Sequence, residues 1–144
     1  MAQPNFATYD PEKVSLVYGA LIITGFAQDS MITVARKTPT WSSTAGSDGF
    51  VTRAKNLDKR GDITIVLDMS SPTNDALSAL FYADEMTGKG AQAIMMRDAS
   101  GTSVASGASA WIVQPATIEF GNGVLGRTWN FEVAVLAITP GGNL

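Results

Sequence analysis

The sequence predicts a mostly β domain, a β-sandwich or open barrel with one flanking α-helix. Several short segments alternate apolar and polar side chains, which is typical of strands with one face in a core and the other in solvent. A single segment, residues 71–88, changes to the spacing of an amphipathic helix. The length of 144 residues fits one domain, residues 1–144, that can bury a core of its own.

The N-terminal part predicts a hairpin. Apolar side chains alternate over residues 14–18, stop at Gly19 and resume over residues 21–24. After a turn at residues 27–30, the segment 31–37 has the composition of a strand, and we expect it to return as the partner of the first.

The stretch TWSSTAGSDGF, residues 40–50, follows this hairpin and consists largely of small side chains. We interpret it as a long irregular connection. Most connections have about 4 to 6 residues, and a longer one usually serves a function outside its own core.

The middle of the chain predicts two strands and then the helix. Residues 50–55 form the first strand, and residues 61–68 form a second with Ile63, Ile65 and Leu67 facing the core. In the helix, Ser71 is the expected N-cap, Pro72 takes the first helical position and Gly88 ends it. Its core-facing side chains are expected to be Ala76, Leu77, Leu80, Phe81 and Ala83.

The C-terminal part returns to β structure. The alternation of Trp129, Phe131, Val133 and Val135 predicts one long strand over residues 127–138. Asn122-Gly123 is typical of a type I′ hairpin turn, in which both central residues need positive φ. Further strands are expected at residues 91–97, 109–113 and 117–120.

The composition does not favour an enzyme. The chain has no histidine and no cysteine, so the commonest general base, the commonest metal ligand and all thiolate chemistry are absent. No carboxylates form a pair with the spacing of a catalytic or calcium site. The GxGxxG match at residues 121–126 precedes a strand instead of a helix, which excludes the dinucleotide-binding reading. We therefore expect no catalytic, metal or cofactor-binding residues.

The charge and hydropathy patterns argue against nucleic-acid binding and against a membrane anchor. The net charge is −3, and the basic group of Arg53, Lys55, Lys59 and Arg60 has acidic neighbours, so we interpret it as surface or subunit interface. The N-terminus has no signal-peptide pattern, and no apolar run approaches the ~20 residues of a membrane helix.

The order of these segments resembles the tail tube proteins of contractile-tailed bacteriophages. The resemblance is carried by GALIITGF at residues 19–26, GSDGFVTR at residues 46–53, and DITIVL followed by SPTNDALS at residues 62–67 and 71–78. Turns and strands near residues 98–101, 110–112 and 127–129 continue it, so that it covers nearly the whole chain.

The resemblance implies a tail-tube-like fold whose copies join into hexameric rings, stacked into a tube inside a sheath. The implied partners are further copies of the chain, the sheath protein, a tape measure, and baseplate or initiator proteins; DNA passes through the tube without specific binding. The implied location is the virion tail, with assembly in the host cytoplasm. Residues 38–49 become an extended assembly loop, and the subunit-contact candidates are Trp41, Ser42, Ser43, Thr44, Asp48, Phe50, Arg53 and Lys55.

An acidic lumen would let DNA slide because it repels phosphates. Six copies with a charge of −3 each would carry −18. The lumen-facing candidates are the strand-surface acids Asp62, Asp68, Glu119 and Glu132. Two alternatives stay open: the tube of a phage-like bacteriocin or secretion system, and a monomeric β-sandwich that acts as a binding module.

Overall fold

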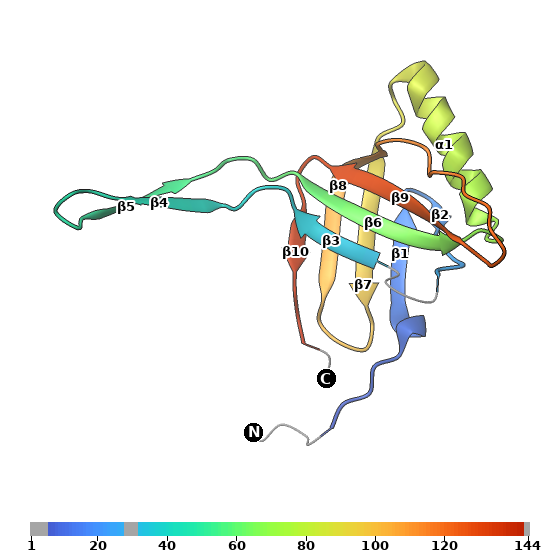
Figure 1. Ribbon diagram of the computed structural model, residues 1–144, viewed down its shortest axis with the longest axis horizontal. Helices are drawn as coiled ribbons and strands as arrows, with labels where there is room; N and C mark the ends of the chain where they lie inside the picture. Colours follow the sequence, from blue (N-terminus) through green and yellow to red (C-terminus); the bar gives the residue numbers. More distant parts are fainter. Residues whose placement is uncertain (1–5, 28–31, 143–144) are drawn as a thin grey trace.

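A computed structural model describes residues 6–27 and 32–142 (Figure 1). A short 3₁₀ turn, η1 (Pro11–Lys13), leads into the first strand, and one helix, α1 (Thr73–Thr87), lies in the middle of the chain. The strands are β1 (Val14–Tyr18), β2 (Leu21–Ile22), β3 (Ile32–Arg36), β4 (Trp41–Ala45), β5 (Val51–Lys55), β6 (Gly61–Asp68), β7 (Gln92–Asp98), β8 (Val104–Ile112), β9 (Gly126–Val133) and β10 (Ala137–Thr139).

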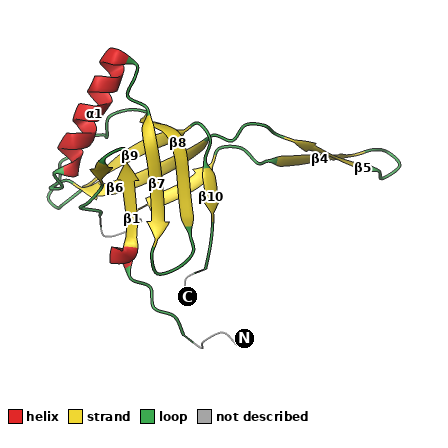
Figure 2. Cartoon of the chain, turned by 180° about the vertical axis from the view of Figure 1, so that it is seen from behind, coloured by secondary structure: helices red, strands yellow, loops and turns green. Residues whose placement is uncertain are grey.

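Eight of these strands form one antiparallel sheet in the order β2-β1-β7-β8-β9-β6-β3, with β10 paired to the first part of β8. The sheet curls, as the crossing strand directions in Figures 1 and 2 show. Beyond β2, Phe26 forms a bridge to Leu67 of β6, and the Asp68 amide donates to the Gly25 carbonyl at 2.8 Å. The mostly β fold with an open barrel and one flanking helix is therefore confirmed.

The core lies inside the curl of this sheet. In β6 the burial alternates strictly, with Ile63, Ile65 and Leu67 fully buried, as predicted. In β9 the predicted inward set of Trp129, Phe131 and Val133 is buried too. β6 and β9 pair in full register, so these two inward rows pack side by side and define the centre of the core.

The helix lies against one end of the sheet (Figure 2). The predicted start is wrong by one residue, because Pro72 is the N-cap and Thr73 is the first helical residue. The Ser71 hydroxyl still accepts a hydrogen bond from the Thr73 amide at 3.3 Å. The helix ends at Gly88 as predicted, where φ of +67° favours a residue without a side chain. Leu77 is the fully buried apolar side chain of the helix, whereas Leu80 and Phe81 are only partly buried.

The predicted N-terminal hairpin is wrong in its pairing. β1 turns at Gly19, which has a φ of +60°, and pairs with the short β2. The strand expected to return to it, β3, instead pairs with β6, from Ile32 opposite Ile65 to Arg36 opposite Gly61. The alternation of apolar and polar residues within a segment predicts a strand but does not predict which distant strand it pairs with. Residues 28–30 of the turn predicted at residues 27–30, and Met31, lie outside the described residues.

Two predictions for the C-terminal part are also wrong. Residues 117–120 form no strand, and neither Asn122 nor Gly123 has a positive φ, so there is no type I′ turn. Residues 113–125 instead form a loop that passes beside α1. The strand predicted for residues 127–138 is split into β9 and β10 by a turn, which leaves Val135 exposed.

Candidate assembly site

A two-stranded hairpin projects from the body of the protein, which corrects the expectation of an irregular loop (Figures 1 and 2). Here called the arm, it comprises residues 41–55, in which β4 pairs with β5 from Trp41 opposite Lys55 to Ala45 opposite Val51. The two strands form a separate sheet, and all their residues are exposed. Sequence analysis did not predict β4, because both of its faces are exposed and its sequence therefore lacks the alternation of apolar and polar residues that a half-buried strand shows.

The tip of the arm is closed by local hydrogen bonds. The Gly46 amide donates to the Phe50 carbonyl, and the Gly49 amide donates to the Gly46 carbonyl, both at 2.9 Å. The Asp48 carboxylate accepts from the Phe50 amide at 3.0 Å, and Gly49 has a φ of +85°. The tip sequence GSDG therefore specifies a tight turn, since glycine and aspartate supply the conformation and the side-chain acceptor that it needs.

The two faces of the arm differ. By the alternation of strands, one face carries Ser42, Thr44, Thr52 and Ala54, which are small. The other face carries Trp41, Arg53 and Lys55, and the Arg53 guanidinium carbon lies 3.7 Å from the centroid of the Trp41 ring. This cation–π contact holds the Trp41 indole and the Arg53 guanidinium together on the same face of the arm.

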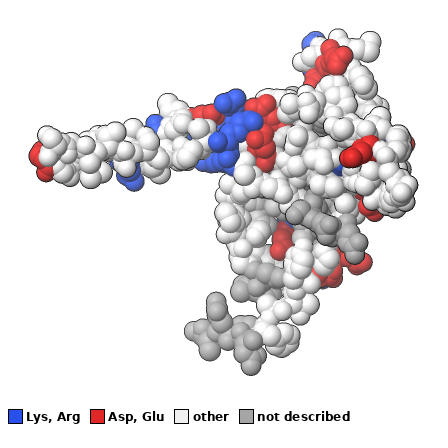
Figure 3. Space-filling view, in the orientation of Figure 1, with Lys and Arg blue, Asp and Glu red and all other residues white. Residues whose placement is uncertain are grey.

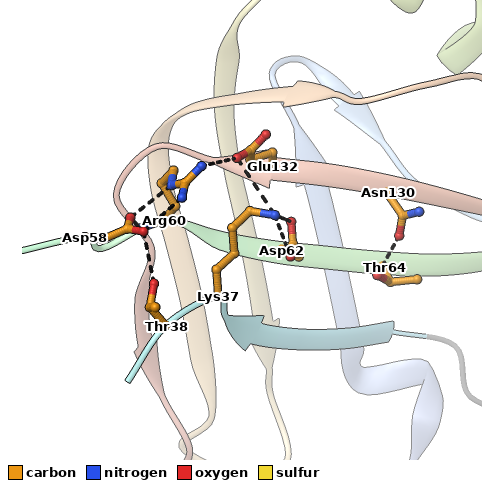
Figure 4. A network of polar contacts seen from close by, with 8 residues as sticks. All are labelled: Lys37, Thr38, Asp58, Arg60, Asp62, Thr64, Asn130 and Glu132. Carbon is orange, nitrogen blue, oxygen red and sulfur yellow. Dashed lines mark hydrogen bonds and ion pairs between the residues drawn. The ribbon is translucent and has the colours of Figure 1, made fainter. Parts of the chain in front are cut away.

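An ion-paired cluster fixes the root of the arm, where the chain leaves and re-enters the body (Figure 4). Asp58 accepts from the Thr38 hydroxyl at 3.0 Å and forms an ion pair with Arg60, also at 3.0 Å. Arg60 reaches Glu132 at 3.5 Å, and Lys37 pairs with Asp62 at 2.9 Å. Figure 3 shows the positive and negative side chains side by side at this position.

The electrostatics of the root follow from these contacts. Hydrogen bonds from Arg60 and Thr38, with the positive charge of Arg60, hold the pKa of Asp58 well below its usual range. The same pair raises the pKa of Arg60. Both groups are charged at neutral pH, so the two chain segments that enter the arm are tied to each other and to β9.

The structure brings all predicted subunit-contact candidates onto the arm. Trp41, Ser42, Ser43 and Thr44 lie on β4, Asp48 and Phe50 at the tip, and Arg53 and Lys55 on β5. Sequence analysis did not predict that Lys37, Thr38 and Asp58 come together at the root of the arm. The only available signal was their position on either side of the predicted loop.

The four lumen-facing candidates do not form one patch. Asp62 and Glu132 lie opposite each other on β6 and β9, and Lys37 lies between them in the root cluster. Asp68 lies at the far end of β6, and Glu119 is exposed in the loop before β9. The outer face of β6 and β9 is nevertheless polar, since Thr64 donates to Asn130 at 2.7 Å between these acids.

The described residues offer no metal centre: no three acidic, histidine or cysteine side chains within residues 6–27 and 32–142 are grouped to hold an ion. In the same part of the chain, the structure contains no helix with the length and apolar character that crossing a membrane requires. The described residues form a packed body with a projecting hairpin.

The chain belongs to the bacteriophage PhiTE tail tube protein family, whose profile matches residues 14–138. It is also 28% identical over 145 residues to "Structural protein ORF10" of Pseudomonas phage KPP10, an alignment that covers 95% of this chain and 84% of that protein. The protein is thus a phage structural protein of a tail tube family.

Solved structures share the fold. The tube-terminating cap of the anti-feeding prophage superposes with a TM-score of 0.67 at 10% identity, covering 96% of this chain and 95% of that one. The sheath/tube terminator of an extracellular contractile injection system, PVC, gives a TM-score of 0.65 at 10% identity, covering 94% and 99%. At this identity the likeness concerns the fold alone.

Proposed function

We propose that the protein self-assembles into rings of six copies, and that the rings stack into the tail tube through which phage DNA passes. The observation that carries this proposal is the combination of a tail tube family match over residues 14–138 with an exposed arm whose two strands pair with no other strand in residues 6–27 and 32–142. An isolated two-stranded hairpin is at best marginally stable in water. Contact with another copy would supply the missing partner.

The exposed side chains of the arm support its role in subunit contact. Trp41 is 47% exposed, Phe50 72% and Val51 62%, all on an element that projects into solvent. Aromatic side chains and arginine are the residues most enriched among those that dominate binding energy. The subunit-contact candidates therefore remain the eight predicted residues, Trp41 to Thr44, Asp48, Phe50, Arg53 and Lys55.

The polar outer face of β6 and β9 supports a lumen that does not retain DNA. Asp62, Asp68 and Glu132 lie on this face; Asp62 is paired with Lys37, and Glu132 is paired with Lys37 and Arg60. An acidic surface repels phosphates, and a net negative chain has little of the counterion release that drives nonspecific binding to DNA. Glu119, in the loop beside α1, is the fourth proposed lumen residue.

The proposed location is the virion tail, with assembly in the host cytoplasm. The further proposed partners are the sheath protein of a contractile tail, the tape measure, and baseplate or initiator proteins. The protein would have no enzymatic role, since tube proteins act by assembly. We include the contractile type because the chain shares its fold with the sheath/tube terminator of the PVC extracellular contractile injection system.

Electron microscopy of the purified chain tests this proposal. A ring of six 15.1 kDa chains would have a mass of about 91 kDa, six times that of the monomer. We expect rings or tubes with six-fold symmetry at rising concentration, and short tubes when phage tail initiator is added. A chain that remains monomeric at high concentration and with initiator would contradict the proposal and favour a monomeric binding module.

The second candidate is the tube of a phage-like particle that carries no genome, such as a bacteriocin or a secretion system. The observation in its favour is the fold shared with the anti-feeding prophage cap and the PVC terminator. Nucleic acid in particles purified from the source would exclude this candidate, and genome-free particles of constant length would support it.

A further inference from the structure

The charges of this chain are strongly separated along its sequence. Residues 36–60, which contain the arm and its root, hold six of the ten basic residues but only two of the thirteen acidic ones. This segment therefore carries +4 and the remainder carries −7. Opposite net charges on two parts of one chain favour association of the positive part of one copy with the negative part of another.

Within the positive segment, Arg53 and Lys55 are the cations on the arm itself; the exposed Lys59 also forms no ion pair among the described residues, and Arg36 is hydrogen-bonded to the Leu136 carbonyl. Lys37 and Arg60 are paired with acids at the root. Arg53 and Lys55 form no ion pair with any other residue in the described part of the chain. They share one face with Trp41, so this face presents an indole flanked by two positive charges.

An apolar groove with Glu12 at its rim lies elsewhere on the body, and the exposed Lys13 follows Glu12 in the same 3₁₀ turn. The groove has a volume of about 490 Å³ and is lined by the start of β1, by the segment after β2, and by Pro11 and Glu12 of η1. Its apolar lining includes Val14, Ile22 and Phe26. Glu12 is exposed at the rim, and Asp10, whose carboxylate accepts from the Glu12 amide at 3.0 Å, adds a second negative charge next to it. The groove lies within the ~300–1,000 Å³ range of binding pockets.

The arm points away from the groove of its own chain. The arm is rooted beside Gly61 at one end of β6, and the segment that lines the groove pairs with Leu67 near the other end, roughly 20 Å away at about 3.3 Å per residue. In Figure 1 the arm extends away from β1 and β2. A contact between these two surfaces therefore joins two copies head to tail, and such contacts generate rings or filaments.

We propose that the Trp41, Arg53 and Lys55 face of the arm docks into the groove beside Glu12 on a second copy of this chain. This inference rests on the proposed self-assembly and names the surface that the arm meets. The indole enters the groove against Val14, Ile22 and Phe26, which removes exposed apolar surface from water on both partners. Arg53 and Lys55 meet Glu12 and Asp10 at the rim, which fixes the orientation.

Site-specific cross-linking tests the contact directly, because the chain has no cysteine. Ser43→Cys lies opposite Arg53 on the docking face, and Ser15→Cys lines the groove; neither change removes a proposed charge. Mixing the two variants under mild oxidation should give a covalent dimer of unlike chains. The matched control pairs Ser43→Cys with Ser109→Cys, an exposed position on β8 outside the groove, and should give at least tenfold less dimer.

Charge reversal gives a second readout. Glu12→Lys should raise the concentration needed for assembly about tenfold, and adding Arg53→Glu in the same chain should restore it. Equal cross-linking in both mixtures, or normal assembly of Glu12→Lys, would overturn the proposed docking. Specific cross-linking without rings or tubes would contradict the tube and leave the docking standing, whereas tubes without the cross-link would contradict the docking alone.

Discussion

The Arg36 guanidinium donates two hydrogen bonds to the backbone carbonyl of Leu136, from Nε at 3.1 Å and from Nη2 at 2.9 Å. These residues are 100 positions apart, at the end of β3 and in the turn between β9 and β10. The Leu136 side chain is fully buried and lies over Gly61, the first residue of β6 after the arm. The root of the arm is therefore built into the core of the body, although the arm itself is exposed.

The contact between Gly61 and Leu136 predicts a large effect for a small substitution. A Cβ at position 61 would clash with the Leu136 side chain, so Gly61→Ala should lower the free energy of unfolding by about 1–3 kcal/mol. Urea denaturation measures this value. Gly123→Ala is the matched control, because a Cβ there meets no atom within 4 Å, and its effect should stay within about 0.5 kcal/mol. Equal stability of both variants would show that Leu136 can move aside.

The helix predicts a difference between two leucines of one face. Leu77 is fully buried, so Leu77→Ala should lower the free energy of unfolding by about 2–5 kcal/mol. Leu80 is partly buried and borders an open groove beside Tyr18, so Leu80→Ala should cost clearly less. Thermal and urea denaturation of both variants give the comparison. If Leu80→Ala proved the more harmful, the packing of α1 on the sheet would have to differ from that described.

The strands of the core could be predicted because a strand with one buried face has apolar residues at every second position of its sequence. Apolar, buried side chains alternate with outward ones along β6 and, from Trp129 onward, along β9, so the alternation predicts both the strand and its inward face. The partner of β3 could not be predicted, since its pairing with β6 depends on residues about thirty positions away. Residues 117–120 show a strand-like pattern, yet Ile118 and Phe120 are exposed in a loop.

The candidate site also has features that the sequence predicted and features that it did not. A long stretch of small residues indicated a segment with an external function, and the candidates chosen there lie together on the arm. Its hairpin form was missed because both faces are exposed. For the acids of β6 and β9, alternation predicted the outward face, but the cations that meet Asp62 and Glu132 come from the root, which only the fold brings near.

The root cluster predicts a defined pH dependence. Hydrogen bonds from Arg60 and Thr38 lower the pKa of Asp58, so its stabilising contribution is complete above the ordinary aspartate pKa of about 3.9. That contribution should be lost only as the pH falls further, through the lowered pKa of the folded state. The Arg60 amide donates to Asp58 at 3.1 Å, so its NMR shift reports the titration. Asp58→Asn is the control and should abolish the shift change, while a midpoint near 3.9 would show that the ion pair does not form in solution.

Removal of the arm should separate folding from assembly. Thr40 and Asn56 are already joined by a backbone hydrogen bond of 2.6 Å, so a short Gly-Ser turn can replace residues 41–55 without stretching the root. Because β4 and β5 pair only with each other, and loop length changes closure entropy little, the melting temperature should shift by no more than about 4 °C. Assembly should fail, since the face with Trp41 and Arg53 is gone. Melting temperature and electron microscopy on one preparation test both statements, with Gly123→Ala as a control that should form tubes. Normal tubes from the shortened chain would show that strand edges or the helix carry assembly, and a collapsed melting temperature would show that the body depends on the arm for its own stability.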